Sequence, residues 1–367
     1  LRLWIELLKN AYYKNATELE TLPNIDINIK CGNSLVSRFA IDADLKQALK
    51  KSKWSIDSYK LAVDTYRNAE SKEQKREMER LIADIKSNFR SEISANDPKV
   101  KKLYTLNGEL VKLSTQQSLF EMSTKEKADW NKKITQLTTE TQKLEAEIEE
   151  IKSNKIFENA FEWRFEFPEV LNDEGDFVGF DVVIGNPPYI RQEELGEFKT
   201  HLSSNFKVFT SVGDIFSYFY ELSYNVMREN GYFSFINNTF DKTTAGKSLR
   251  EFAVKNFSFI KYIDFTDVVV FEEATTYPII LIAKKNIHKN NFQFYKYTKT
   301  NFNDKEIIQN ESNFTTVEQE NLNSTVWNFI NRFEQNILLK IQAHKSLISQ
   351  FGRCYRGILT GFNKAFI

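Results

Sequence analysis

The sequence feature that most constrains the fold is a long helical seam in the middle of the chain. Residues of this seam recur in alternating steps of four and three, the spacing of helices that pack side by side. The seam runs through Trp130, Ile134, Leu137, Thr141, Leu144, Ile148 and Ile151. A matching seam precedes it, through Leu103, Leu106, Leu110, Leu113, Gln117 and Phe120. We predict that these two helices pack antiparallel.

The starts of both helices carry recognisable signals. Asp97 and Pro98 form an N-cap followed by proline at the first helical position. Ser123 and Glu126 have the spacing of a capping box. The range 42–155 contains almost no glycine or proline, so we predict three helices that form a coiled-coil insert.

Both flanks of the insert favour an α/β fold. A chain of 367 residues is too long for one small domain. We predict a core at residues 1–41 and 156–300, interrupted by the insert, followed at 301–367 by a linker and the start of another domain. A helix opens the chain, and we expect strands at Ile25–Cys31, FDVVIGN, GYFSFIN, FIKYIDF and YPIILIAKK, with later helices at 214–229, at 247–255 and from about residue 325. Two apolar runs, VVI and IILIA, indicate a parallel sheet buried on both faces, in which ligands bind at the carboxyl ends of the strands.

Composition excludes several classes of protein. The 50 basic side chains equal the 50 acidic ones, so nothing favours a surface that is basic throughout. Two cysteines and three scattered histidines provide neither a zinc site nor a disulfide framework, which indicates a reducing compartment. No run is apolar enough for a membrane span or a signal peptide, so we expect a soluble, cytoplasmic protein. The abrupt start at Leu1 predicts an internal piece of a longer polypeptide.

The most informative motif follows the strand FDVVIG. It consists of Asn186, Pro187, Pro188 and Tyr189. Two stiff prolines hold the Asn186 side-chain oxygen and the Pro187 carbonyl away from the chain, with an aromatic plane beside them. Such acceptors suit a planar substrate with an amino group, because accepting both N–H hydrogens frees the nitrogen lone pair for attack on a methyl group. The alternative is that the prolines only stiffen a loop.

FDVVIGNPPYI resembles the catalytic motif of S-adenosylmethionine-dependent N6-adenine DNA methyltransferases of the gamma group. The resemblance implies a Rossmann-like sheet, a flipped adenine in double-stranded DNA, and catalysis by residues 186–189. IKCGNSL resembles the family's third-strand motif, which implies that Asn33 binds the cofactor adenine. Phe219, within GDIFSYFYEL, would wall that adenine or else belong to the core. Phe271, within DFTDVVVFEEATTYPIILI, would stack on the target base opposite Tyr189.

Two further stretches, FEWRFEFPEV and GILTGFNKAF, resemble type IIG fused restriction-modification enzymes. The second resembles the start of their target-recognition domain. The family's glycine-rich cofactor loop and the acidic residue that ends its second strand have no counterpart here, so the first two strands of the sheet are expected before Leu1. We therefore predict that this chain binds S-adenosylmethionine weakly and is inactive alone, and that its partners are the upstream cofactor loop and the downstream recognition domain of the same polypeptide. Whether a nuclease is also attached stays open.

Several motifs have plainer interpretations. Glu150-Ile151-Lys152 has the spacing of some nucleases, but its place on a helix favours a solvated face. Residues 245–248 resemble the end of a P-loop, yet Asp241 stands where that motif needs glycine. Three nearby cations could instead contact DNA phosphates: Lys242, Lys247 and Arg250.

Other functions remain open at this point. Related enzymes use the same motif on RNA or on protein glutamine. From a different class of function, the helical insert could be a binding or assembly module, a brace for the sheet, or a clamp on DNA.

Overall fold

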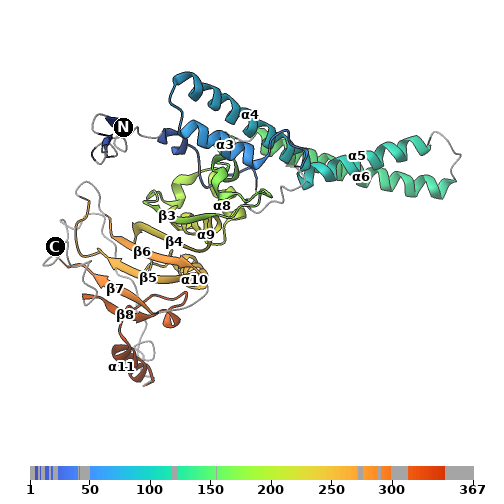
Figure 1. Ribbon diagram of the computed structural model, residues 1–367. Coiled ribbons are helices and arrows are strands. Elements are labelled where there is room, and N and C mark those ends of the chain that lie inside the picture. Colours follow the sequence, from blue (N-terminus) through green and yellow to red (C-terminus); the bar gives the residue numbers. More distant parts are fainter. Residues whose placement is uncertain are drawn as a thin grey trace, which may run out of the picture.

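A computed structural model of the chain (Figure 1) describes residues 24–39, 41, 50–117, 123–153, 155–271, 276–286, 291–298 and 313–343, together with residues 5, 6, 9, 13–15, 18 and 19. The predicted helix from Leu1 to Tyr12 lies mostly outside these residues, as do both ends of the chain. Two short strands, β1 (Tyr13–Asn15) and β2 (Glu18–Leu19), pair antiparallel near the start.

The main sheet has the strand order β3-β4-β6-β5-β7-β8. Its strands are β3 (Phe180–Gly185), β4 (Met227–Asn238), β5 (Phe257–Asp264), β6 (Pro278–Lys285), β7 (Asn291–Lys296) and β8 (Thr315–Glu318). The pair β3–β4 is parallel, as the run VVI predicts, and the pair β5–β7 is parallel as well. The run IILIA lies in β6, for which a parallel arrangement was wrongly predicted. The sheet is nevertheless mixed, because β6 is inserted antiparallel between β4 and β5. A run of apolar residues signals burial, but it carries no information about strand direction.

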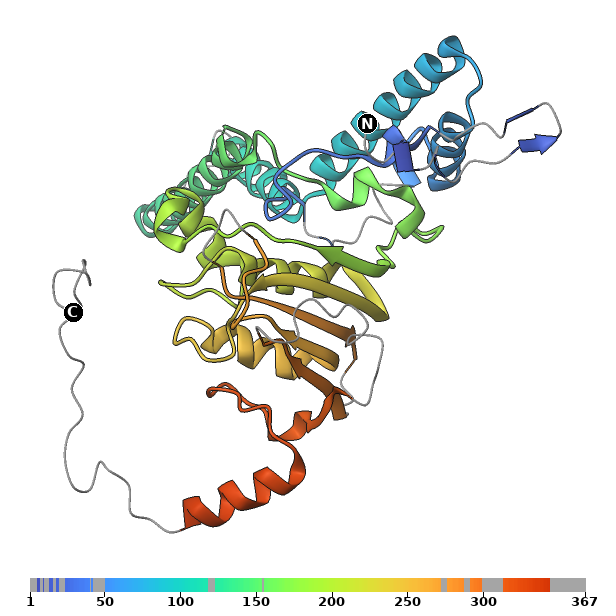
Figure 2. The ribbon, with the colours of Figure 1, turned by 90° about the vertical axis from the view of Figure 1, so that its left-hand side faces the viewer.

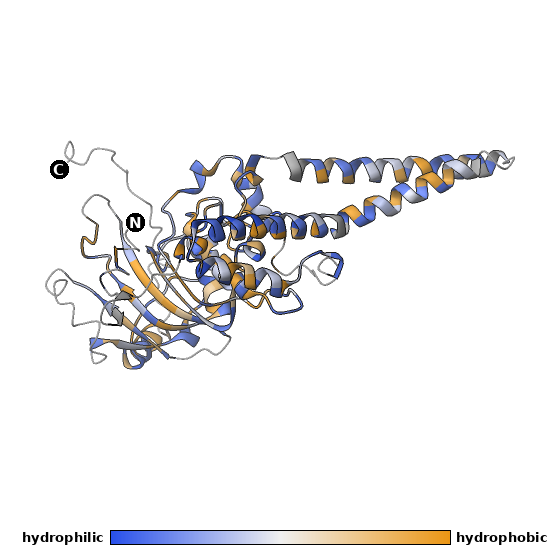
Figure 3. Ribbon diagram, turned by 45° about the horizontal axis from the view of Figure 1, so that its top comes forward, coloured by the Kyte–Doolittle hydropathy of each residue, from blue (hydrophilic) through white to orange (hydrophobic). Residues whose placement is uncertain are grey.

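Two helices cover one face of this sheet: α9 (Phe216–Val226) and α10 (Lys247–Asn256). Tyr220 of α9 contacts the rings of Phe233 and Phe235 on β4 at 5.4 Å. Phe257 of β5 lies 4.5 Å from Phe233. These side chains belong to one large buried core beneath the two helices. Figure 3 shows the strands as the most hydrophobic part of the molecule.

The opposite face and the free edge of the sheet are more exposed. Among the described residues β3 pairs with β4 alone. Val182 is 60% exposed and Ile184 80% exposed, although their sequence predicted burial on both faces. Tyr232 of β4 is 44% exposed on this side. Apolar side chains of β3 therefore remain exposed that the described residues do not cover.

The helical insert has four α-helices among the described residues, where three were expected: α3 (Ile56–Arg67), α4 (Lys72–Asn96), α5 (Pro98–Gln117) and α6 (Thr124–Ser153). Ser55 and Ser71 cap α3 and α4 through their side-chain oxygens. Figure 1 shows α5 and α6 as a hairpin arm that projects from the rest of the molecule.

The two helices of this arm lie antiparallel, as their seams predict. Leu106, Leu137 and Leu144 are buried between them, with Leu103, Leu110 and Leu113 packed around. The indole nitrogen of Trp130 donates to the Leu113 carbonyl at 3.2 Å. Ion pairs Lys99–Glu147 (2.9 Å) and Lys102–Glu140 (2.5 Å) cross the arm nearer its base.

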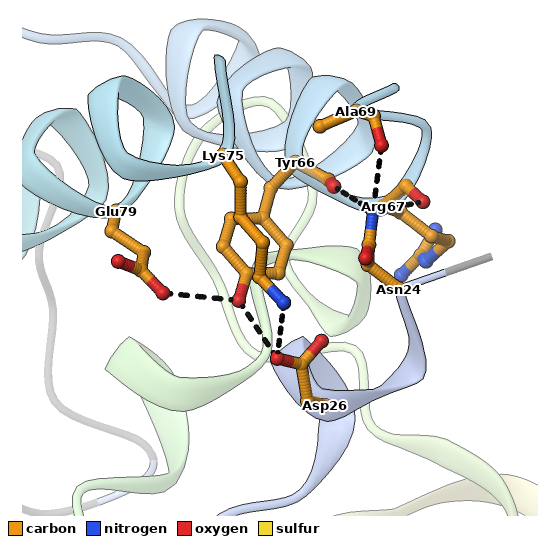
Figure 4. A network of polar contacts seen from close by, with 7 residues as sticks. All are labelled: Asn24, Asp26, Tyr66, Arg67, Ala69, Lys75 and Glu79. Atoms are coloured by element: carbon orange, nitrogen blue, oxygen red, sulfur yellow. Dashed lines mark hydrogen bonds and ion pairs between the residues drawn. The ribbon is translucent and has the colours of Figure 1, made fainter. Parts of the chain in front are cut away.

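The predicted strand Ile25–Cys31 is wrong, because Ile25–Asn28 forms the 3₁₀ helix η1. This segment pairs with helices instead of strands. Asn24 donates to the carbonyls that end α3, and Asp26 accepts from Lys75 at 2.6 Å and from Tyr66 at 3.0 Å (Figure 4). Alternation of polar and apolar residues fits a short 3₁₀ helix as well as a strand. The contacts with the helical insert therefore determine which of the two forms.

Residues 313–331 pack against the sheet, although the predicted core ended at residue 300. β8 pairs with β7, and Trp327 lies in the main core with 1% exposure. The predicted helix from residue 325 begins later, since residues 325–331 are not helical and α11 spans Arg332–Ala343. Figure 2 shows α11 below β8. No helix among the described residues is long and apolar enough to cross a membrane.

Candidate functional site

The segment Asn186–Tyr189 leaves the sheet at the carboxyl end of β3. β3 approaches β4 closely at its start, where Gly179 has φ +98° and a Cβ would lie 2.5 Å from the Arg228 nitrogen. Only glycine adopts that conformation without strain. At the other end of the strand Asn186 is exposed and Pro187 is buried. The motif is thus anchored by its first proline, with the amide side chain accessible.

The chain that follows is held by the segment leading into α9. Ile215 donates its backbone N–H to Ile190 at 2.9 Å, and Gln192 donates to Gly213 at 3.0 Å. The Tyr189 hydroxyl reaches the Ile236 carbonyl on β4 at 3.4 Å. Burial raises the pKa of Tyr189, so the phenol stays neutral. These contacts place Tyr189 beside the carboxyl ends of β3 and β4.

A cavity of about 230 Å³ opens directly at this motif. Its lining is mostly apolar and comes from β3, the segment that follows β3, β4, α9, the loop at Ser34 and the short helix α7 (Trp163–Glu166). The residues are Ser34, Trp163, Val183, Ile184, Gly185, Asn186, Pro187, Pro188, Phe219, Leu222, Ser223, Val226 and Phe235. The structure therefore brings Asn186, Pro187 and Pro188 together with Phe219 around one space.

Phe219 satisfies both interpretations of its role. Its ring is half-buried and packs against the main core, and it also lines the cavity. Asn33 does not line the cavity among the described contacts, because its side-chain oxygen accepts from the Leu35 nitrogen at 3.2 Å. Its neighbour Ser34 does line the cavity. The IKCGNSL loop therefore borders the cavity through Ser34, and the binding of the cofactor adenine by Asn33 stays a prediction.

Phe271 lies in the loop after β5, at the same edge of the sheet as Tyr189. β3, β4 and β5 run in one direction, so their carboxyl ends share that edge. However, β4 and β6 separate β3 from β5. No contact between Phe271 and Tyr189 is among those of the described residues. Their opposition across a base remains a prediction.

Two of the proposed phosphate contacts remain accessible, and one does not. Lys242 and Lys247 are exposed. Arg250 is 3% exposed, and its guanidinium donates to the carbonyls of Phe240, Thr243 and Ser324. The suggestion that Arg250 binds DNA is therefore wrong, because its charged head is used inside the loop that follows β4.

The remaining motifs show no sign of a second site. Gly246 begins α10, where a Cβ would meet the Phe240 carbonyl at 2.2 Å, so its loop is closely packed. Glu150 to Lys152 lie on α6, and their side chains are outside the described part. No three acidic, histidine or cysteine side chains among the described residues are placed to hold a metal.

Sequence reasoning assigned no role to Trp163, which lines the cavity. The signal was present, since Trp163 belongs to FEWRFEFPEV, a stretch that already resembled type IIG enzymes. The sequence could not show that Trp163 lies beside Ser34, because 129 positions separate them. In the structure the indole N–H of Trp163 donates to the Ser34 carbonyl at 3.2 Å.

Comparisons with known proteins point the same way as the motif. Residues 103–271 match the Eco57I restriction-modification methylase family. The type II restriction enzyme and methyltransferase RM.Eco57I of Escherichia coli is 31% identical over 202 residues, covering 51% of this chain and 19% of the relative. The type II methyltransferase M.BstVI of Geobacillus stearothermophilus is 32% identical over 121 residues, covering 32% of this chain and 22% of the relative.

This chain spans about a fifth of the length of those curated relatives. A modification subunit of a putative type I restriction enzyme from Vibrio vulnificus YJ016 has 14% identity and a TM-score of 0.33 over 43% of this chain and 40% of that one. Residues 103–271 thus carry the match to the Eco57I restriction-modification methylase family, and the similar curated proteins are type II restriction-modification proteins.

Proposed function

We propose that this chain is the catalytic portion of an S-adenosylmethionine-dependent DNA adenine-N6 methyltransferase from a restriction-modification enzyme. The observation that carries the proposal is the cavity at the end of β3, lined by Asn186, Pro187, Pro188 and Phe219. The matched family, which spans residues 103–271, supports methylation of DNA.

In this proposal, Asn186 and Pro187 act as hydrogen-bond acceptors. The Asn186 side-chain oxygen and the Pro187 carbonyl accept the two hydrogens of the adenine amino group. The nitrogen lone pair is then free to attack the methyl carbon. As the new N–C bond forms, the carbon–sulfur bond would break and leave a neutral thioether, and the excess proton on nitrogen passes to water. S-adenosylmethionine, when bound, supplies the electrophilic methyl group. Rate acceleration comes mainly from orientation, since no general base with a shifted pKa is needed.

Tyr189 and Phe271 stabilise the extruded base by stacking. Removing a base from the duplex costs roughly a few kcal/mol. Stacking on an aromatic side chain contributes about 1–3 kcal/mol per contact, which offsets that cost. The ring of Tyr189 is half-buried, and its hydroxyl donates to the Ile236 carbonyl, so the ring is already ordered for this role.

The residues present fit the adenine end of the cofactor. The cavity is an apolar slot with Phe219 on its wall, while Ser34 supplies a polar group beside it. Its volume of about 230 Å³ is below the roughly 300–1,000 Å³ of complete ligand pockets. We therefore propose weak binding by this chain alone. The open edge of β3 is where further strands and a glycine-rich loop of the same polypeptide would complete the pocket.

The decisive experiment replaces Asn186 by alanine in the complete polypeptide. We expect transfer of labelled methyl groups to duplex DNA to fall by roughly 10²- to 10³-fold, by analogy with loss of one preorganised transition-state contact. DNA binding should be unchanged, because phosphate contacts dominate affinity. Val182→Ala, on the exposed face of the same strand, is the matched control. Full activity of Asn186→Ala would refute the assignment, and RNA and protein acceptors assayed in parallel would identify a different substrate.

The projecting arm is either a brace for the sheet or a binding or assembly module, and deleting it distinguishes these functions. Residues 103–139 can be deleted and replaced by a short glycine linker, because the ion pair between Lys102 Nζ and Glu140 Oε1 (2.5 Å) shows that α5 and α6 are neighbours at this level of the arm. We expect unchanged methyl transfer and unchanged oligomeric state, as for a simple brace. Loss of DNA binding would instead assign a clamp, and altered assembly would assign a partner surface.

A further inference from the structure

Two segments that are far apart in the sequence meet beside the cavity. The loop 33–38 precedes the helical insert, and the segment 159–163 follows it. Asn33 donates its backbone N–H to Asn159 at 2.6 Å, and Phe161 donates to Val36 at 2.8 Å. Gly32 permits the approach, since a Cβ there would lie 3.0 Å from the ring of Phe161. The roots of the insert are therefore joined at the mouth of the site.

Glu162 is the main side chain in this junction. It is 3% exposed, and both of its carboxylate oxygens accept hydrogen bonds from the loop. Oε2 accepts from the Ser37 hydroxyl at 2.6 Å, and Oε1 accepts from the Arg38 backbone nitrogen at 3.0 Å. A buried carboxylate needs such donors, and bonds to a charged acceptor are stronger than neutral ones. Glu162 thus determines where the loop lies.

Trp163 follows directly and presents its indole ring to the cavity. Its ring nitrogen donates to the Ser34 carbonyl at 3.2 Å. Its ring centroid lies 4.7 Å from that of Phe161 and 5.9 Å from that of Phe180 on β3. The indole is therefore fixed on several sides, so ordering it for a ligand costs little further entropy.

We propose that Trp163 is a binding residue for the planar heterocycle of the cofactor, and that Glu162 is the positioning residue that holds Trp163 and Ser34 in place. This inference rests on the proposed function, because it takes the ligand to be the adenine ring of S-adenosylmethionine. Trp163 and Phe219, which are far apart in the chain, line the same apolar slot, so two aromatic side chains are available to contact the ring. FEWRFEFPEV then serves the cofactor site.

The test uses the chain labelled with 5-fluorotryptophan and titrated with S-adenosylhomocysteine at millimolar concentration. Trp163→Phe identifies the Trp163 fluorine resonance. We expect that resonance to shift saturably, while Trp327, which is buried in the main core, and Trp54, on the insert, do not respond. Trp163→Ala should weaken binding roughly 5- to 150-fold, as for loss of one stacking contact, and Trp163→Phe should retain most of the affinity.

The outcomes separate this inference from the proposed function. Heat of binding in calorimetry without a shift of the Trp163 resonance would overturn the inference and leave cofactor binding intact. If calorimetry shows no heat of binding and no resonance shifts, the proposed function is contradicted, and the inference fails with it.

The positioning role is tested by Glu162→Ala, which should move the Trp163 resonance and weaken binding. Glu162→Gln should largely restore both, because its amide oxygen still accepts one bond. Gln319→Ala is a matched control, since Gln319 is 1% exposed and holds Phe257 and Phe259 far from the cavity. It should lower the melting temperature without changing the resonance. If Glu162→Ala and Gln319→Ala changed the Trp163 resonance equally, Glu162 would contribute only to general stability and would have no positioning role.

Discussion

The sheet and the hairpin arm differ in how widely their buried contacts are shared. In the sheet, the ring of Phe233 contacts residues from β4, β5 and α9, which are far apart in the chain. In the arm, Leu137 is buried only against the facing helix, while Tyr104 and Val111 on the outer side are 72% and 64% exposed. Damage should therefore spread through the sheet and stay local in the arm.

The largest effect is expected for Phe233→Ala. Phe233 is 1% exposed, and removing such a ring costs about 3–5 kcal/mol because a cavity remains. The whole sheet and the cavity at β3 should unfold together, which urea denaturation followed by Trp327 fluorescence would measure. Phe233→Leu should cost less. If the sheet tolerated Phe233→Ala, the contrast with the arm would fail.

A smaller and local effect is expected for Leu137→Ala in the arm. Leu137 is 8% exposed, so its loss should cost about 2 kcal/mol, at the low end for buried leucines. Hydrogen exchange should accelerate in α5 and α6 and remain unchanged in β4 and β6. Val111→Ala, on the exposed side, is the control and should change neither. Faster exchange in the sheet would show that the two regions unfold as one.

The smallest effect is expected where the insert meets the segment after Asn24. Burial alone would raise the pKa of Asp26, but hydrogen bonds from Lys75 and Tyr66 lower it on balance. A lowered pKa means that the folded state favours the charged carboxylate. The resulting stability is complete above the ordinary pKa and is lost as the pH falls through the lowered value. Lys75→Met should thus cost about 0.5 kcal/mol near neutral pH.

The measurement for this variant is the melting temperature as a function of pH. The difference between Lys75→Met and the parent protein should vanish in acid, once Asp26 is protonated. Arg76→Met, on the exposed face of the same helix, is the matched control. A difference that persists unchanged in acid would show that Lys75 acts through packing alone.

Local patterns in the sequence were sufficient for much of this molecule. The seams predicted the antiparallel arm, the apolar runs predicted β3, β5 and β6, and α10 was predicted at 247–255 against Lys247–Asn256. The NPPY motif was placed correctly at the end of a strand. These features succeed because helix periodicity, caps and prolines act within a few residues.

Other features depend on contacts in the folded protein that local sequence patterns do not reveal. Residues 25–28 form a 3₁₀ helix, whose Asp26 accepts hydrogen bonds from both Lys75 and Tyr66. Arg250 is buried because its guanidinium donates to the carbonyls of Phe240 and Thr243 in the preceding loop and of Ser324 far along the chain. β6 runs antiparallel because strand direction follows connectivity.

By itself, the sequence determined the resemblance to a family, the NPPY motif and the periodic helices, because each of these depends on a short stretch of chain. Only the tertiary structure decided that Glu162 and Trp163 meet the loop at Ser34 across the whole helical insert. The physical reason is that burial and hydrogen bonding depend on distance in space, which separation along the chain does not reveal.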